Sequence, residues 1–319
     1  MLKLKEVAAI ACTLVIICIL LVQSFNAPKA NNHERQRRNL QEERPVIYTF
    51  FEPAYESSLS QKSLLLQLET WRTSWMNAGW KAVILTLKDA EQHYLYYHFK
   101  KAFDEARFPV SKYDQMCFYR WLAMAKVGGG WMSDYDTMPL YSNPAESLTL
   151  PNNGKFTSYQ QHVPALVSGS EREWDRMSNL MYQFYLSHGE YYYNDIRAMM
   201  DIQYHTKSCI FENTTKVIDI HEAYKGDYKS KSSFEIDTPY TPNNYLDVIE
   251  RYLEELESSN VIFTTDPSSF IDVCPKLKGK RAIHFSHSAC EKVKFCNELR
   301  EVAVGKWMEM FQEKCIQGK

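Results

Sequence analysis

The sequence predicts an α/β fold in which a mostly parallel β-sheet carries helices on both faces. After residue 45, short β-branched and aromatic runs alternate with longer segments whose apolar residues recur at helical spacing. Apolar residues make up 45% of the 319 residues, which is enough for a large buried core. Because such a sheet binds its ligands at the carboxyl ends of the strands, residues that directly follow strands are the first candidates for a site.

The first part of the body reads as strand, helix, strand. Pro45 introduces VIYTFF, which is typical of a buried strand, and AVILTL at 82–87 predicts a second one. Between them, helical spacing predicts a helix that ends at Ala78-Gly79. The apolar stripe of this helix consists of Leu64, Leu65, Leu68, Trp71 and Trp75.

Two further helices and a short strand follow. Residues 91–108 predict a helix ended by Pro109, and residues 113–127 predict another that ends at three glycines. Trp131–Ser133 reads as a short buried strand. The same patterns predict strands at 164–170, 261–265 and 281–285 and helices at 170–189 and 194–205.

The N-terminus indicates membrane targeting. Val7–Val22 is an uncharged apolar run, shorter than the roughly 20 residues of a typical spanning helix, so a signal peptide and a short anchor are both open. No A-x-A cleavage site follows, which favours a signal-anchor over 1–25, a flexible polar stem over 26–44 and a single domain over 45–319. Basic residues after the run outnumber the two lysines before it, and the positive-inside rule alone gives the opposite orientation.

Composition narrows the function classes and the compartment. The formal net charge of -2 and the dispersed basic residues argue against a nucleic-acid partner. Asn213-Thr214-Thr215 is an N-glycosylation sequon, and the cysteines outside the apolar run are even in number, as a disulfide-permissive compartment allows. Reduced core cysteines remain the alternative, and the aromatic content of 14% suits a core as well as a sugar-stacking site.

The stretch GGGWMSDYDTMPL, residues 128–140, carries the chemistry. Three consecutive glycines end the preceding helix and predict that backbone approaches a ligand or an adjacent strand closely. Asp134 and Asp136 follow the short strand, and residues two apart in an extended chain share a face. Two carboxylates held together repel unless a cation lies beside them, and Mg²⁺ or Mn²⁺ prefers such oxygen ligands. A solvated surface turn is the alternative for so short a motif.

The segment YRWLAMAKVGGGWMSDYDTMPL resembles the core signature of glycosyltransferase family 32, which includes relatives of the initiating α-1,6-mannosyltransferases of the yeast Golgi and α-1,4-N-acetylglucosaminyl- and galactosyltransferases. The match is densest over 113–140 and extends loosely from residue 45 to about 287. The resemblance implies a GT-A fold with a Rossmann-type sheet, a nucleotide-sugar donor, dependence on Mn²⁺ (or Mg²⁺) and retention of anomeric configuration. It also implies a single-pass type II Golgi membrane protein with a lumenal body, which overrides the charge count.

The resemblance also implies roles for single residues. Asp136 would bind the metal directly, Asp134 would contact the ribose or donor sugar and help hold the ion, and Arg120 would reach the donor sugar or diphosphate. Many relatives carry an aspartate three residues before this arginine, where this chain has Cys117, so the identity of the sugar stays open. The expected donor-binding set is Thr49, Phe50, Asp114, Arg120, Gly129, Gly130 and Asp134.

Two further candidates lie outside the signature. GT-A enzymes often complete the metal site with a C-terminal histidine, for which this chain offers His284 and His287, and we favour His287 because it lies past a strand. Asn194-Asp195 opens a helix, where capping is one interpretation and a place for Asp195 beside the acceptor hydroxyl or anomeric carbon is the other. The expected catalytic set is Arg120, Asp134, Asp136 and Asp195, and the expected metal ligands are Asp134, Asp136, His284 and His287.

The sequence therefore favours a metal-dependent Golgi hexosyltransferase that uses a UDP- or GDP-sugar and a glycan or glycoconjugate acceptor. The alternative is a catalytically inactive, membrane-tethered protein that binds glycans or nucleotide sugars. A metal-dependent phosphoesterase would need further Asp and His ligands in tight motifs, and the sequence contains none.

Overall fold

A computed structural model describes residues 44–53, 58–188, 193–207, 209–211, 216–223, 273–286, 290 and 300–318. All of them belong to one compact unit, Arg44–Lys319. Within this described part, no helix is both long and apolar enough to cross a membrane. The expected signal-anchor, the stem up to residue 43, the strand at 261–265, Asn213 and His287 lie outside the described residues.

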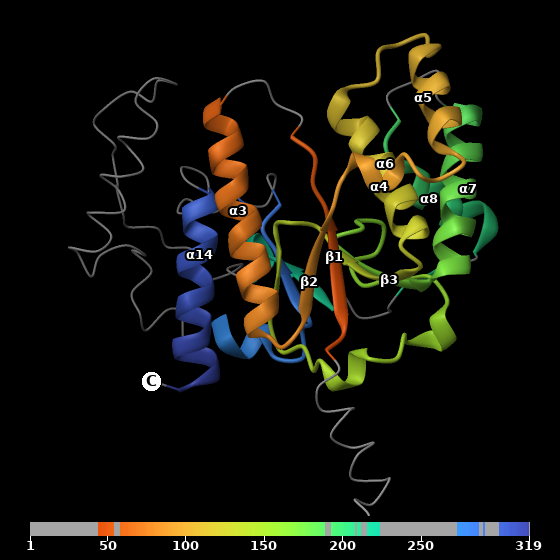
Figure 1. Ribbon diagram of the computed structural model, residues 1–319. Helices are drawn as coiled ribbons and strands as arrows, with labels where there is room; N and C mark the ends of the chain where they lie inside the picture. The colour runs from red at the N-terminus through yellow and green to blue at the C-terminus, as the bar shows by residue number, and fades with distance from the viewer. Residues whose placement is uncertain are drawn as a thin grey trace, which may run out of the picture. The chain divides into compact units, whose positions relative to one another are not determined.

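A six-stranded sheet forms the centre of the unit, in the order β2-β1-β3-β6-β5-β7 (Figure 1). β1 is parallel to both β2 and β3, as the strand–helix–strand pattern predicts. β6 then runs antiparallel to β3 and β5, so the sheet is mixed rather than mostly parallel. The sheet mixes because no helix crosses over between β3 and β6, and the chain returns in the opposite direction. The strands are β1 (Val46–Phe50), β2 (Lys81–Leu85), β3 (Gly129–Ser133), β5 (Thr157–Ser158), β6 (Leu166–Ser170) and β7 (Ile210–Phe211).

A second, three-stranded sheet joins segments that lie far apart in the sequence. Its order is β4-β9-β8, formed by β4 (Thr137–Pro139), β9 (Ala282–His284) and β8 (Val217–Asp219). β9 is antiparallel to β4 and parallel to β8, and this register sets His284 between Thr137 and Asp219. The C-terminal half of the chain is thereby brought to the residue that directly follows Asp136.

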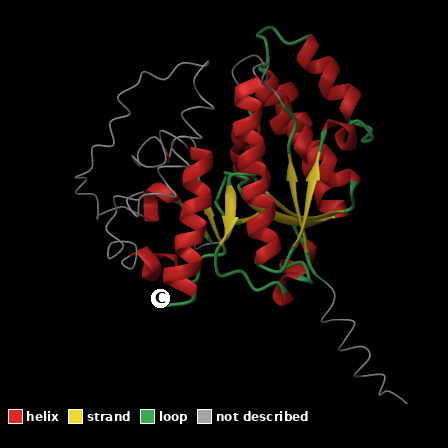
Figure 2. Cartoon of the chain, turned by 60° about the vertical axis from the view of Figure 1, so that its left-hand side comes forward, coloured by secondary structure: helices red, strands yellow, loops and turns green. Residues whose placement is uncertain are grey.

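Helices cover both faces of the large sheet (Figures 1 and 2). α3 and α14 pack with Ile47 and Trp131 in one apolar core, whereas α6, α7 and α8 pack with Met132 and Val167 in the other. The alternation along each strand explains this division, because successive side chains point to opposite faces. The helices are α3 (Ser58–Asn77), α4 (Leu87–Ala90), α5 (Tyr96–Asp104), α6 (Lys112–Lys126), α7 (Glu171–His188), α8 (Asp195–Thr206), α9 (Ile220–Ala223) and α14 (Arg300–Met310), with the short helical turns η1 (Ala145–Ser147), η2 (Asn152–Gly154) and η3 (Phe311–Ile316).

Two details of the predicted helices are wrong. Leu65 was expected on the apolar stripe of α3 but is 54% exposed, while the other four stripe residues are buried. The helix expected over 91–108 is α5 alone, preceded by the short α4 and a turn. In that turn the His93 ring accepts a hydrogen bond from the backbone N–H of Leu95 and contacts Asp175, which competes with continuous helix.

The glycine triplet is explained by an adjacent strand. Gly129 has a φ of +76°, and a Cβ placed on it would lie 2.6 Å from the backbone nitrogen of Glu171. Gly130 lies against the ring of Tyr48, and both glycines begin β3, at the end of the strand opposite Asp134. Gly129 and Gly130 thus pack closely against neighbouring parts of the protein, and the donor contacts expected for them stay a prediction.

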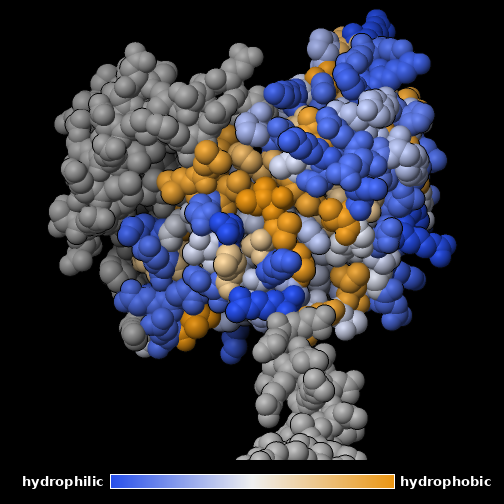
Figure 3. Space-filling view, viewed as in Figure 1, coloured by the Kyte–Doolittle hydropathy of each residue, from blue (hydrophilic) through white to orange (hydrophobic). Residues whose placement is uncertain are grey.

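A disulfide bond joins two segments in the C-terminal part of the unit. Cys274 forms a disulfide with Cys315, which ties the chain before β9 to the end of the molecule, and Cys290 is also disulfide-bonded. Cys117 is a free thiol, and the Sγ of Cys209 lies 3.4 Å from the Sδ of Met177. Figure 3 shows an apolar band across the middle of one face, beside a hydrophilic region over the end that carries α5.

Candidate active site

Asp134 and Asp136 lie in a tight turn that connects the two sheets. The Asp134 N–H donates to the carbonyl of Ala165 (2.9 Å), and the Thr137 N–H donates back to the carbonyl of Asp134 (3.0 Å). The segment is therefore a β-turn and not the extended chain that the sequence suggested. The turn is needed because the chain leaves the large sheet at Ser133 and enters the small one at Thr137.

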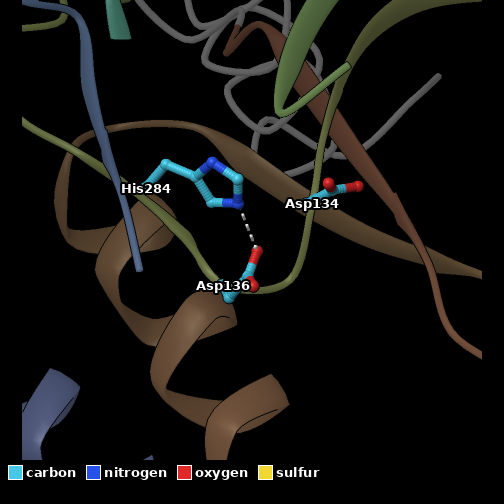
Figure 4. A group of neighbouring side chains, drawn as sticks. All are labelled: Asp134, Asp136 and His284. Atoms are coloured by element: carbon cyan, nitrogen blue, oxygen red, sulfur yellow. Dashed lines mark ion pairs between the residues drawn. The ribbon is translucent and has the colours of Figure 1, made fainter. Parts of the chain in front are cut away.

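His284 approaches this turn from β9. Its Nε2 lies 3.4 Å from Oδ1 of Asp136, and the two side chains point toward one another (Figure 4). One potential ligand atom from each of Asp134, Asp136 and His284 lies within 4.8 Å of the other two. Of the two histidines considered from the sequence, His284 is thus found beside the aspartates, and the favoured His287 lies outside the described residues.

Hydrogen bonds on the far side of the ring fix the orientation of His284. Its Nδ1 lies 3.0 Å from Oε1 of Gln160 and 3.4 Å from Oδ1 of Asp219. Both atoms are acceptors, so Nδ1 carries a proton. Nε2 then carries a second proton toward Asp136 when the ring is charged, and a lone pair when the ring is neutral. Burial opposes charging of the ring, yet Asp136, Asp219 and Asp134 together raise the pKa of His284 above its ordinary value.

Arg120 connects the turn to α8. Its Nε donates to Oδ2 of Asp195 (2.9 Å), one terminal nitrogen donates to the same oxygen, and the other donates to Oδ1 of Asp134. The guanidinium is buried between the two aspartates, which raise its pKa against the effect of burial. Burial raises the pKa of Asp134 to about 6, because the lowering by Arg120 is smaller and Asp136 adds a like charge.

Asp195 is buried, and its carboxylate accepts hydrogen bonds from side chains of α6. Its Oδ2 also accepts from the indole N–H of Trp121 (3.1 Å), and the residue is 1% exposed. Asn194 caps α8, accepting from the N–H of Arg197 (3.1 Å). Through these contacts Asp195 holds Arg120, and Arg120 in turn holds Asp134. The place expected for Asp195 beside the acceptor hydroxyl or the anomeric carbon stays a prediction.

Three members of the site were missed by sequence reasoning. Arg300, the first residue of α14, donates from Nη1 to Oδ2 of Asp136 (3.3 Å) and to the carbonyl of Phe285 (3.2 Å). Asp219 and Gln160 orient His284 and are themselves joined by a 3.0 Å hydrogen bond. Asp219 ends a strand, so the rule that selected Asp134 could have found it. Nothing in the local sequence marks Arg300 or Gln160.

The remaining expected donor-binding residues are spread around the site. By the register of β1 and β3, Thr49 lies beside Ser133, and its buried hydroxyl has no hydrogen-bond partner among the described residues. Phe50 is partly buried and packs against the core on the α6 side. The carboxylate of Asp114, in the first turn of α6, accepts a hydrogen bond from the hydroxyl of Ser111. Cys117 lies one turn before Arg120, and burial, with Asp195 nearby, raises the pKa of its thiol.

Comparisons with known proteins give a family without an assigned activity. A family model described as a domain of unknown function, DUF8765, matches residues 26–195, which include Arg120, both turn aspartates and Asp195. No curated protein matches the chain. Among solved structures, the glycosyltransferase GlyE of Streptococcus pneumoniae TIGR4 aligns at 10% identity and a TM-score of 0.40 over 86% of this chain, and the alignment covers 64% of the GlyE chain. The matching family model is not that of glycosyltransferase family 32, and that assignment remains a proposal. Since the match spans more than half of its length, the chain belongs to the DUF8765 family.

Proposed function

We propose that this chain is a glycosyltransferase that moves a hexosyl unit from a UDP- or GDP-sugar to a glycan or glycoconjugate acceptor. In this proposal Mn²⁺ or Mg²⁺ binds at the turn that connects the two sheets. The observation that carries the proposal is the convergence of Asp134, Asp136 and His284 within 4.8 Å. These side chains come from two segments almost 150 residues apart in the sequence.

The residues present fit a divalent cation. Carboxylate oxygens and a neutral imidazole nitrogen suit Mn²⁺, and the Nδ1 hydrogen bond of His284 leaves its Nε2 available. The described cluster sets four aspartates (Asp134, Asp136, Asp195 and Asp219) against two arginines (Arg120 and Arg300). With His284 neutral, the excess of two negative charges equals the charge of one divalent ion. When bound, the metal would act as a Lewis acid that stabilises negative charge on a departing nucleoside diphosphate.

The protein's own groups have supporting roles in this proposal. Arg120 fixes the carboxylate of Asp134 through a buried contact, and Asp195 with Trp121 fixes Arg120, so the turn is preorganised. Thr49, beside the end of β3, is fully buried, and its expected contact with the nucleotide-sugar donor stays a prediction. Cys117 stands where relatives of family 32 carry a sugar-binding aspartate, which leaves the choice of hexose open. Retention of configuration, Golgi residence and the membrane anchor belong to the proposal through the resemblance of the 119–140 signature.

The test is release of nucleoside diphosphate by the full-length protein in mild detergent. UDP- and GDP-sugars are supplied one at a time, with Mn²⁺ or with a chelator. We expect metal-dependent turnover of one donor, and we expect Asp136→Asn to reduce it at least a hundredfold, because a metal ligand and its charge are lost. Asp104→Asn is the matched control, since Asp104 is an exposed aspartate paired with Lys100 on α5.

Two results would contradict the proposal in different ways. Turnover that persists in Asp136→Asn with unchanged metal dependence would remove the turn from the metal site. Donor binding without turnover under any condition would favour the inactive nucleotide-sugar-binding protein.

A further inference from the structure

Both oxygens of the Asp136 carboxylate already face nitrogen groups of the protein. His284 Nε2 lies 3.4 Å from Oδ1, and Arg300 Nη1 lies 3.3 Å from Oδ2. The two partners differ in what they can do when a metal arrives. The imidazole can itself become a ligand, whereas a guanidinium stays protonated and cannot bind a cation. Arg300 is therefore a competitor for the carboxylate that a metal ion needs.

The position of Arg300 is fixed by its surroundings. The residue is 5% exposed, and the same Nη1 that contacts Asp136 also donates to the carbonyl of Phe285, the residue directly after His284. The N–H of Phe285 donates in turn to the backbone carbonyl of Asp136 (2.9 Å). These contacts hold the buried guanidinium at the turn, where solvent screening of its charge is weak.

We propose, resting on the metal site of the proposed function, that Arg300 is a built-in counter-cation of Asp136 that competes with the divalent metal and lowers its affinity. Arg300 neutralises the carboxylate while the metal is absent, which offsets the repulsion from Asp134. When the metal binds, the guanidinium must yield Oδ2 or tolerate a divalent ion at short range. In both cases, removal of its charge favours the metal.

The experiment measures Mn²⁺ binding to the full-length protein by the electron paramagnetic resonance signal of the free ion, which needs no turnover and no donor. Arg300→Gln and Arg300→Met remove the charge and keep much of the side-chain volume. We expect both to bind Mn²⁺ at least about tenfold more tightly than the unaltered protein, given the strength of charge interactions at a few ångströms in a buried site. Arg300→Lys keeps the charge and is expected to stay within about threefold of the unaltered affinity.

Lys306→Gln is the matched control. It removes one positive charge from the same helix, but Lys306 pairs with Glu309 and has no contact with the turn among the described residues. An unchanged Mn²⁺ affinity in Lys306→Gln, together with tighter binding in the neutral Arg300 variants, would assign the effect to the contact with Asp136 and not to net charge.

Opposite or absent shifts overturn the proposal. Weaker Mn²⁺ binding in the neutral variants would mean that Arg300 orients Asp136 for the metal, and equal binding would mean that it does not compete. If neither neutral variant folds, as judged by circular dichroism, Arg300 is a structural partner and the proposal fails. If neither the unaltered protein nor the folded neutral variants bind Mn²⁺, the metal site of the proposed function fails as well, which separates the two failures.

Discussion

Replacement of Asp195 by alanine tests the network that supports the turn. Asp195 is 1% exposed, and its Oδ2 accepts from Nε of Arg120 (2.9 Å) and from the indole nitrogen of Trp121 (3.1 Å). The substitution leaves a buried guanidinium with one anionic partner in place of two and removes the acceptor of a buried indole N–H. Removal of one partner of a buried ion pair costs about 3–5 kcal/mol, because the other charge stays desolvated.

The contacts of Arg120 set the expected value within that range. Arg120 keeps its contact with Asp134, so we expect a loss of about 3 kcal/mol in the free energy of unfolding for Asp195→Ala. For a domain of this size that loss corresponds to a fall of about 6–12 °C in Tm. Asp195→Asn keeps an acceptor for the indole and loses only the charge, and we expect about half of this effect.

Thermal unfolding of the full-length protein, followed by near-ultraviolet circular dichroism, measures the change. Asp104→Ala is the control, since Asp104 is 67% exposed at its side chain and pairs with Lys100 at the surface, where a pair contributes about 0.5 kcal/mol or less. A Tm for Asp195→Ala within about 2 °C of the unaltered protein would refute the network, because a buried charge cannot lose half of its partners at so small a cost.

Two further predictions concern the sheet and the response to acid. Gly129→Ala is expected to destabilise the protein by more than about 3 kcal/mol, because the added Cβ would lie 2.6 Å from the backbone nitrogen of Glu171. Gly279 has a similar φ of +81° but open space around it, so Gly279→Ala should cost only about 1–2 kcal/mol. Equal shifts in Tm for the two variants would contradict this explanation. Burial, against the opposing effect of Asp175, lowers the pKa of His93 below 6.5, so the folded state binds fewer protons there than the unfolded chain and loses stability as the pH falls through 6.5 and then through the folded pKa. Melting at about pH 7.5 and about pH 5.5 should therefore show a smaller acid loss in His93→Gln than in the unaltered protein, and an equal loss would exclude His93 as a source.

Local pattern was sufficient for most elements of the described unit. The runs VIYTFF and AVILTL became β1 and β2, and helical spacing located α3, α6, α7 and α8 to within a few residues. These segments succeed because the period of their apolar residues matches a single buried face. The antiparallel pairing of β6 with β3 could not be predicted, since a short apolar strand carries no information about the direction of its neighbour.

The site likewise contains residues that a local pattern marks and residues that only tertiary packing brings in. Asp134 and Asp136 were found because two acids follow a strand, and Asp219 follows the same rule at the end of β8. Arg300 contacts a residue 164 positions away, and only the packing of α14 brings it there. The sequence around Asp195 likewise does not indicate that Arg120 and Trp121, both on α6, contact its carboxylate.

The region matched by the family model contains only part of the proposed metal site. Residues 26–195 contain the turn aspartates with Arg120 and Asp195, and they end before Asp219, His284 and Arg300. The second group reaches the turn only through the register of the small sheet, where His284 faces Thr137 on one side and Asp219 on the other. A slip of one residue in β9 would turn His284 to the opposite face of that sheet. The arginine–aspartate network thus lies within the matched region, whereas His284 and Arg300 reach the turn only when the C-terminal segment docks correctly. If the proposed metal site is correct, we expect its affinity to depend on that docking more than on folding of the large sheet.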